Sequence, residues 1–492
     1  MPMRLLFVAS ALATFVLIPS AQAATYCVGD PTCQGVAEPT LTAALTAADQ
    51  TPELDAIELG IGEYTGHFKN AAGRPVRISG MGPLTTIAPD VNNAPALTIT
   101  GSSSTVSNVG VELGHSTVLG MGMRLDGGAS GDGITVTAAS GAINDTGIEL
   151  GAGASLTRTD IRLGGLLLGM IGVKISGDGV TVSDLDINAA IGVYGLGDAV
   201  VRRTRIASAA TGMNLSGGNT RVSSTLLDVR EGGHGIDASA RADVAQVTIV
   251  GADTPGRIGL RATGSGALKV RDSIVAGMQT AYSAGAPATI SLDHVVRDPA
   301  AKEIGAVVDA NPITIAPQFA GLGTAPFALA PGSALVDTGS DAPLAADESA
   351  WDLSGDPRIS DGTGDCVARR DPGAYETAAA PCVPVAPAAT PAPVATPAPP
   401  TAPPANTDRT APKLTKLKLT RAKLTFTLSE AATAKVTVQR KRGKRYVIAR
   451  KLTKTSRAGA NSVALRLRTG HYRVLVDVVD LAGNRVSAHR SL

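Results

Sequence analysis

One short phrase recurs through the middle of this 492-residue chain, between about residues 147 and 295. Each copy opens with glycine and continues with an apolar, a variable and an apolar residue, as in Gly172-Val173-Lys174-Ile175. A second phrase follows each copy, with apolar residues at both ends, as from Val182 to Ile187. Segments with a period of two, repeated about every 22 residues, are typical of a solenoid. The opening glycines lie 25, 20, 20, 23 and 24 residues apart, at Gly147, Gly172, Gly192, Gly212, Gly235 and Gly259.

The repeat predicts strands. The apolar-variable-apolar triplet places two side chains on one face and the third on the other, as in a half-buried strand. Such a strand cannot bury its face alone, so it must stack on the same strand of the next coil. A leucine-rich repeat of similar length needs Leu and Asn at fixed positions, and this chain lacks that consensus. We expect three short strands per coil, with the recurring glycine at a sharp corner that requires its unusual φ values.

With this pattern the chain resembles the right-handed parallel β-helix repeat proteins that share the pectate-lyase-like fold, over roughly residues 36 to 376. The resemblance implies a fold and no single reaction, because this scaffold carries lyases, hydrolases, adhesins and inert surface proteins. The predicted fold class is therefore all-β: a right-handed parallel β-helix solenoid, a Pro-rich linker and a small antiparallel β-sandwich.

Both ends of the predicted β-helix carry distinct segments. Residues 39–49 predict a short helix with Leu41, Ala44, Leu45 and Ala48 on one face, which would cover an open end of the sheets. Beyond residue 298 the period is lost. The stretches 331–339, 352–359 and 371–376 resemble the closing segment of secreted bacterial β-helix proteins, with "PGSxxxDxG", "DxxGxPR" and "GAYE" patterns. The resemblance implies a cap that closes the last coil.

The chain is predicted to be exported. Residues 1–23 contain an apolar run from Leu5 to Ile18 and then Ala21-Gln22-Ala23, the pattern of a secretory signal peptide. The run is short for a membrane span, and no second long apolar run exists. We expect an extracellular protein, secreted or associated with the cell surface, with no membrane span after removal of the signal.

Four cysteines fit an oxidising compartment. They allow three pairings, and local pairing would join Cys27 to Cys33 and Cys366 to Cys382, one bridge at each end of the solenoid. A metal site made of all four thiolates is disfavoured because no CxxC spacing is present.

The remainder of the chain divides into a spacer and a second domain. Residues 377–412 are rich in Pro, Ala and Thr and favour an extended linker. Residues 413–492 alternate at period two between turn residues, which predicts an antiparallel sandwich. The closing stretch from Gly470-His471-Tyr472 to Asn484 resembles bacterial immunoglobulin-like or fibronectin-type modules. The expected organisation is a signal peptide at 1–23, a capped β-helix at 24–376, a linker at 377–412 and a basic module at 413–492.

Charge divides the chain unevenly. Residues 413–492 contain 20 Lys or Arg and 3 Asp or Glu, a net +17, whereas the rest contains 24 and 39, a net −15. Such a basic field attracts anionic polysaccharides or cell-wall polymers, and a merely solvated surface or docking on the acidic solenoid are the alternatives. Five basic residues are predicted at one hairpin tip and are the candidate binding residues: Arg440, Lys441, Arg442, Lys444 and Arg445.

Nucleic acid is not the expected partner. Only 3% of the chain is aromatic, and Phe426, Tyr446 and Tyr472 of the basic module fall on apparent core or strand positions. Base stacking and neutral-sugar stacking both need exposed rings. We expect a monomer that contacts anionic groups through Lys and Arg.

Two groups in the solenoid are candidates for catalysis. If the coils align, His234, Asp237 and Arg261 lie together in an outward column, and Gly233-His234-Gly235 resembles a motif of polygalacturonases. The other motifs of those enzymes are absent, and hydrolysis by two carboxylates needs a second acid that Asp237 lacks nearby.

The second group is Asp160, Asp186 and Arg205, at one position of successive second phrases. It resembles the calcium-plus-arginine chemistry of pectate lyases. A ladder of neutralising charges is the alternative. No cofactor is expected otherwise, with Asp160 and Asp186 the candidate calcium ligands. No P-loop, Rossmann glycine pattern, HExxH or GxSxG motif is present.

The sequence thus favours a secreted, non-catalytic surface or matrix protein whose basic module binds an anionic polymer. The alternative is a polysaccharide lyase or glycoside hydrolase acting on acidic polysaccharide.

Overall fold

The computed structural model describes most of the chain outside its first residues and its linker. The described residues are 22–90, 94–114, 120–139, 144–164, 169–253, 255–382, 411–430, 432–442, 445–465, 467, 470–480 and 484–492. Nearly all of the predicted signal peptide and most of the predicted linker therefore lie outside them. The chain divides into two compact units, residues 1–385 and 386–492.

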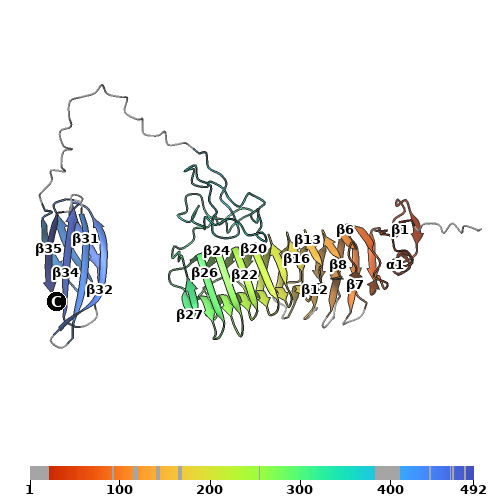
Figure 1. Cartoon of the computed structure of the whole chain (residues 1–492), viewed down its shortest axis with the longest axis horizontal. Coiled ribbons are helices and arrows are strands. Elements are labelled where there is room, and N and C mark those ends of the chain that lie inside the picture. The colour runs from red at the N-terminus through yellow and green to blue at the C-terminus, as the bar shows by residue number, and fades with distance from the viewer. Residues whose placement is uncertain are drawn as a thin grey trace, which may run out of the picture. The chain divides into compact units, whose positions relative to one another are not determined.

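The first unit is a parallel β-solenoid, as Figure 1 shows. Its strand pairings form three parallel stacks, which are described here as three sheets. The first sheet stacks β5 (Phe68–Lys69), β7 (Pro95–Thr100), β9 (Met121–Asp126), β12 (Thr146–Leu150), β15 (Ile171–Ile175), the ends of β17 (Asp186–Gly195) and β19 (Arg205–Leu215), β21 (His234–Ala238), β23 (Ile258–Ala262), β25 (Thr280–Ala284) and β27 (Lys302–Gly305).

The second sheet precedes a corner that leads into the third. It stacks β1 (Thr25–Val28), with β2 (Val36–Glu38) beside it, β3 (Asp55–Leu59), β6 (Val76–Ala88), β8 (Thr105–Leu113), β10 (Ser130–Asp132), β13 (Ser155–Thr157), β16 (Val180–Ser183), β18 (Ala199–Arg202), β20 (Asn219–Asp228), β22 (Arg241–Val250), β24 (Ala267–Ala276), β26 (Thr289–Arg297) and β28 (Val307–Asp309). The third sheet contains β4 (Gly62–Thr65), β11 (Thr135–Ala138), β14 (Asp160–Arg162) and the remaining ends of the long strands β6, β8, β17, β19, β20, β22, β24 and β26.

The predicted stacking and register are confirmed. Inward positions of the first sheet, such as Val173, Val193 and Met213, are fully buried in one continuous core. The outward positions form one column in parallel register, as predicted from the repeat: Arg124, Glu149, Lys174, Tyr194, Asn214, Asp237, Arg261 and Ser283.

The recurring glycine has a different cause from the one predicted. It does not have positive φ; the left-handed corner lies between the second and third sheets and is occupied by residues such as Arg158, Asp184 and Arg203, with φ of 46°, 60° and 43°. The glycine is required by space, because a Cβ on Gly172 would lie 2.5 Å from Ile187 Cγ2 and 2.8 Å from the next coil's backbone oxygen.

Gly172→Ala is therefore expected to destabilise the solenoid by about 1–3 kcal/mol through overpacking. A Cβ on Gly285 would meet nothing closer than an oxygen at 3.9 Å, so Gly285→Ala is the matched control and should change stability little. Chemical denaturation of the full chain measures both. An equal response of the two variants would contradict the steric explanation.

The predicted N-terminal helix is confirmed as α1 (Leu41–Ala48). The Thr40 hydroxyl accepts a hydrogen bond from the Ala43 backbone N–H at 3.1 Å and begins the helix. The four residues predicted to share one face are buried, and they contact the same core as the solenoid strands: Leu41, Ala44, Leu45 and Ala48.

The C-terminal segment of the solenoid differs from the expected cap over the last coil. Residues 313–377 run along the outer face of the third sheet, beside the last coils, as the teal loops of Figure 1 show. Within this segment, residues 347–349 also contact Arg202, Arg221 and Ser223 of the second sheet. Ile274 and Val296 of the sheet pack against Leu335, and Leu226 packs against Tyr375. The terminal strand β27 is exposed along its whole length and pairs with β25 on one side. The segment thus covers a side of the solenoid.

A buried ion pair holds this segment to the sheet. Arg358 is fully buried, and its guanidinium donates to the Glu376 carboxylate at 3.1 Å and to the Ser224 hydroxyl at 3.2 Å. Burial raises the pKa of Glu376 above its usual value, and the Arg358 charge opposes that rise and favours the carboxylate. The arginine and glutamate of the "DxxGxPR" and "GAYE" stretches therefore have a structural role.

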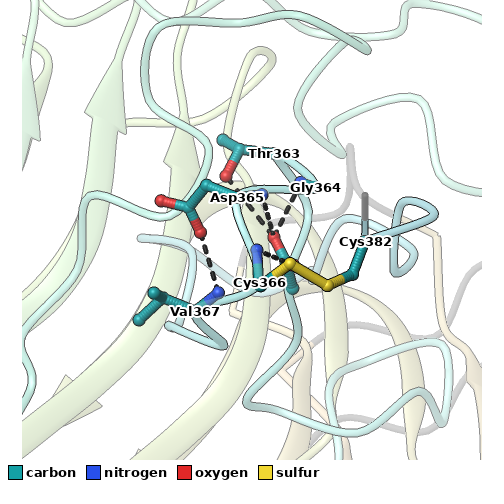
Figure 2. The surroundings of a disulfide bond; sticks show 7 residues. Thr363, Gly364, Asp365, Cys366, Val367 and Cys382 are labelled. Atoms are coloured by element: carbon teal, nitrogen blue, oxygen red, sulfur yellow. Dashed lines mark hydrogen bonds between the residues drawn. A yellow bond between two sulfur atoms is a disulfide. The ribbon is translucent and has the colours of Figure 1, made fainter. Parts of the chain in front are cut away.

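The two local disulfides are present. Cys27 pairs with Cys33, with a Cα–Cα distance of 5.8 Å, and Cys366 pairs with Cys382 at 5.0 Å. Figure 2 shows the second bridge beside a tight turn. The Asp361 carboxylate accepts backbone hydrogen bonds from that turn, including one from the Cys366 N–H at 2.7 Å. The bridge thus joins this turn to the end of the side-covering segment.

The second unit consists of two antiparallel sheets around one core. The first sheet orders β29 (Leu414–Leu419), β30 (Lys423–Leu428) and β33 (Gly459–Ala464), and the second orders β32 (Arg445–Ser456), β31 (Ala432–Arg442), β34 (Tyr472–Asp480) and β35 (Arg485–Ser491). Inward side chains such as Phe426, Val436 and Val476 are almost fully buried between them. The predicted small antiparallel domain is confirmed.

Candidate functional site

The outward column of the first sheet brings His234, Asp237 and Arg261 together. Asp237 and Arg261 are paired residues of β21 and β23. The Arg261 guanidinium donates to Asp237 through Nε at 3.0 Å and contacts the other carboxylate oxygen through Nη2 at 2.7 Å. Its Nη1 lies 2.9 Å from His234 Nε2. The guanidinium of Arg261 therefore contacts both Asp237 and His234.

The electrostatics of this group favour a neutral histidine. Burial, followed by the positive charge of Arg261, lowers the pKa of His234, and Asp237 only partly opposes this. A neutral imidazole can accept the Arg261 hydrogen bond at Nε2. His234 Nδ1 is then left buried without a hydrogen-bond partner.

A second carboxylate does not stand opposite Asp237 in this column. The column neighbours of Asp237 are Asn214 and Arg261. The next acidic residue of the column is Glu149, four coils away, which corresponds to roughly 19 Å at the usual strand spacing. Two-carboxylate hydrolysis needs a separation of about 5–9.5 Å. The column as built therefore does not provide that pair.

Glu149 is held by an ion-pair network that sequence reasoning did not identify. Its side chain is 6% exposed and contacts Arg124 at 3.3 Å and Lys174 at 3.1 Å. The Ser176 hydroxyl donates a further bond at 2.9 Å. The predicted column already contained the signal for this network. It places Glu149 between Arg124 and Lys174 on adjacent coils, where one acid can pair with two cations.

The Asp160 and Asp186 positions are adjacent, as predicted, and both bind an arginine. Arg162 contacts Asp160 at 2.7 Å and Asp186 at 3.1 Å. On the neighbouring corner, Arg203 binds Asp184 through two nitrogens at 2.7 and 2.6 Å. These contacts form a charge ladder across the coils.

Calcium at these carboxylates stays a prediction. Arg162 would have to release both Asp160 and Asp186 before a cation could bind between them. Within the described ranges, no group of three or more His, Cys, Asp or Glu side chains is arranged to hold a metal ion. A calcium ion at this pair would therefore compete with Arg162 for both carboxylates.

The second unit presents a strongly basic surface. The three acidic residues that the structure describes in this unit are not exposed: Glu430 and Asp477 are half-buried, and Asp480 is buried. In contrast, fourteen basic side chains among the described residues are exposed: Lys413, Lys416, Lys418, Arg421, Lys423, Lys435, Arg440, Lys441, Arg445, Arg450, Lys454, Arg457, Arg485 and Arg490.

The strands that flank the predicted hairpin tip are confirmed, and their basic residues divide between two faces. Strands β31 and β32 pair up to Arg442 and Arg445. Successive strand residues point to opposite faces, so Arg440 and Lys441 separate. The Arg440 guanidinium lies 5.9 Å from the ring centre of the buried Tyr472. Lys444 and the side chain of Arg442 lie outside the described residues.

An exposed tyrosine corrects the expectation that the module offers no ring at its surface. Tyr446 is 36% exposed, because the β31–β32 hairpin extends beyond the core. The Arg473 guanidinium lies 4.5 Å from the centre of this ring, and its Nε donates to Gln439 Oε1 at 3.0 Å. Stacking and a side-chain hydrogen bond together orient the arginine.

The membrane prediction has one structural test. No helix in the described part of the chain has both the length and the apolar composition needed to cross a bilayer.

Comparisons with known proteins show similarity in structure alone. No protein-family model matches the chain, and no curated protein matches it. An alginate lyase from Paenibacillus sp. str. FPU-7 is similar over 58% of this chain and 99% of its own, with 15% identity and a TM-score of 0.37. Pectate lyase Pel9A is similar over 72% of this chain and 97% of its own, with 12% identity and a TM-score of 0.42. A pectin methylesterase from Aspergillus niger is similar over 63% and 94%, with 12% identity and a TM-score of 0.26.

Proposed function

We propose that this protein binds anionic polysaccharides outside the cell through its basic second unit, and that its solenoid is non-catalytic. The observation that carries the proposal is the imbalance of exposed charge on that unit, where fourteen basic side chains are exposed among the described residues and no acidic one is. Two disulfides support an extracellular location, because such bridges persist in oxidising compartments.

The physical basis of the proposal is a positive electrostatic potential that no exposed acidic residue of the described second unit offsets. Exposed cations such as Lys435, Lys441 and Arg445 make no ion pair in the described structure. Their repulsion is relieved when a polyanion lies along the surface and releases its counterions. The oriented guanidinium of Arg473 adds a directional contact, because a guanidinium can donate two parallel hydrogen bonds to one carboxylate or sulfate group. Anionic sugars supply those groups repeatedly.

The proposal that the solenoid is non-catalytic rests on one group in the first sheet and one in the third. Arg261 binds both oxygens of Asp237, and the column holds no second acid within reach. Arg162 binds the other two candidate carboxylates. These interactions stabilise the coils and leave neither group poised as a base.

The test compares two triple variants of the full chain on immobilised polygalacturonate. Replacing Arg440, Lys441 and Arg445 with glutamine is expected to weaken retention roughly tenfold or more. Salt should have the same effect, because the screening length falls from about 10 Å at 0.1 M to about 3 Å at 1 M. The matched control is glutamine at Lys416, Lys418 and Lys423 on the other sheet, which removes the same charge and should weaken retention less.

Two outcomes would contradict the proposal. Equal retention on a neutral dextran matrix would show that charge does not drive binding. New reducing ends or unsaturated uronates, released from polygalacturonate with or without calcium, would show that the solenoid is catalytic.

A further inference from the structure

The hydrophobic core of the solenoid ends in charged residues at its last coil. Each sheet contributes an inward column of side chains in parallel register. The column of the first sheet ends at Glu303, that of the second at Asp309 and that of the third at Arg297. The residues that occupy the same columns in the preceding coils are hydrophobic and almost fully buried: Ile236, Leu260 and Tyr282; Val244, Val270 and Leu292; Leu227, Ile249 and Val275. Arg297, Glu303 and Asp309 thus form a terminal layer of three charges at the end of the core.

The terminal layer contains one ion pair and one acid without a partner. Arg297 Nε lies 2.6 Å from Glu303 Oε1, and the two side chains are 19% and 38% exposed. Asp309 is half-buried and forms no ion pair with any residue that the structure describes, and its Oδ1 is buried and accepts no hydrogen bond. The hydroxyl of Tyr282, in the preceding coil, is likewise buried without a partner. Unsatisfied polar groups cost stability, so packing does not explain why hydrophobic columns end in charges.

The same end of the solenoid has two free strand edges. Strand β27 pairs with β25 and β28 pairs with β26, and neither has a second strand beside it in the described chain. Both strands carry a large apolar side chain at the surface, Ile304 at 51% and Val308 at 68% exposed. Figure 1 shows β27 at the end of the stack. A free edge with apolar side chains is a template on which a strand of another chain can pair.

The opposite end of the solenoid is closed in a different way. There α1 packs its apolar face on the core, with Leu41 and Leu45 almost fully buried. A helix does not continue a stack of parallel strands, so the two ends do not match. Two copies would therefore meet through their C-terminal ends about a two-fold axis, which buries the same surface on both.

We propose that the terminal layer prevents the C-terminal ends of two copies from pairing with each other. Pairing would remove two acids and one arginine of each copy from water and bring ends of the same net charge together. Asp309 would lose its hydration without gaining a counter-ion, which makes association unfavourable. This role belongs to the first unit and is independent of polymer binding by the second.

The experiment gives the terminal layer of the full chain the residue types of its own columns, with Arg297→Val, Glu303→Leu and Asp309→Leu. The variant is expected to dimerise, with a mass by light scattering about twice that of the monomeric parent. Backbone hydrogen exchange should slow in β27 and β28 of the dimer, because their free edges become paired. Exchange in β2, at the opposite end, should not change.

The matched control makes the same changes of residue type at exposed positions outside the last coil, with Arg241→Val, Glu231→Leu and Asp341→Leu. It should stay monomeric, because it alters charge and apolar surface equally but leaves the terminal layer intact. Asp309→Leu alone keeps the Arg297–Glu303 pair and should dimerise more weakly than the triple variant. Circular dichroism verifies that each variant is folded.

Three results would overturn the proposal. The parent chain could already be a dimer with protected β27 and β28, the folded triple variant could stay monomeric, or its dimer could protect β2 instead. If the triple variant does not fold, Asp309→Leu decides, and a folded Asp309→Leu chain that stays monomeric overturns the proposal.

Discussion

Replacing Arg358 with alanine is expected to lower the free energy of unfolding of the first unit by about 3–5 kcal/mol. Its guanidinium is fully buried and donates to the backbone oxygens of Gly373 and Ala374 at 3.0 and 2.8 Å, besides Glu376 and Ser224. Removing the arginine leaves the glutamate and two backbone oxygens buried without their donor. It also leaves a cavity between the side-covering segment and the sheet.

Guanidinium chloride denaturation of the full chain, together with limited proteolysis, measures this effect. Cleavage should appear first within residues 341–377, because that segment loses its attachment. The control is Arg369→Ala, whose arginine pairs with Asp365 at 3.0 Å while both side chains are substantially exposed, at 32% and 48%. Exposed pairs contribute about 0–1 kcal/mol, so the control should change little. Similar losses in both variants would contradict the role assigned to Arg358.

Removing the bridge between Cys366 and Cys382 with serine at both positions is expected to cost roughly 3 kcal/mol. The bridge closes a loop of 16 residues that contains the buried Asp371 and Glu376. Without it, the unfolded chain gains conformational freedom, and the end of the side-covering segment is no longer fastened. The change should appear as a lower denaturation midpoint and as faster cleavage next to residue 377.

The Cys27–Cys33 bridge is the comparison for this prediction. It closes a loop of only 6 residues, so serine at both positions should cost roughly 2 kcal/mol by the same loop-closure argument. Cleavage near residue 377 should not change in that variant. A larger loss from the N-terminal bridge, or unchanged cleavage after loss of the C-terminal one, would contradict the prediction.

Much of the solenoid could be predicted from the sequence because its contacts repeat. In a parallel stack each coil lies on the next with the same register, so aligning the phrases also aligns the side chains. The outward column from Arg124 to Ser283, and the meeting of Asp237 with Arg261, followed from that rule. The helix α1 and the two disulfides were equally accessible, because the relevant residues are close in sequence.

The repeat did not reveal why glycine recurs. Periodicity shows that a small residue is needed at Gly172, but not whether backbone conformation or space requires it. Only the distances to Ile187 and to the next coil decide for space. The exposure of Tyr446 could not be predicted for a related reason. Alternation along a strand shows which side chains share a face, but not where the strand extends beyond the core.

The path of residues 313–377 was decided by tertiary structure alone. Its contacts join residues far apart in the chain, such as Arg202 with Asp347, which are separated by 145 positions, and Ser224 with Arg358, separated by 134. Motif resemblance indicated a closing segment but not the surface that it covers. The sequence by itself thus determined the coils, their register and the basic module, since each depends on local or repeated contacts. Which face of the solenoid is covered depends on the shape and burial of surfaces that exist only after the coils have stacked.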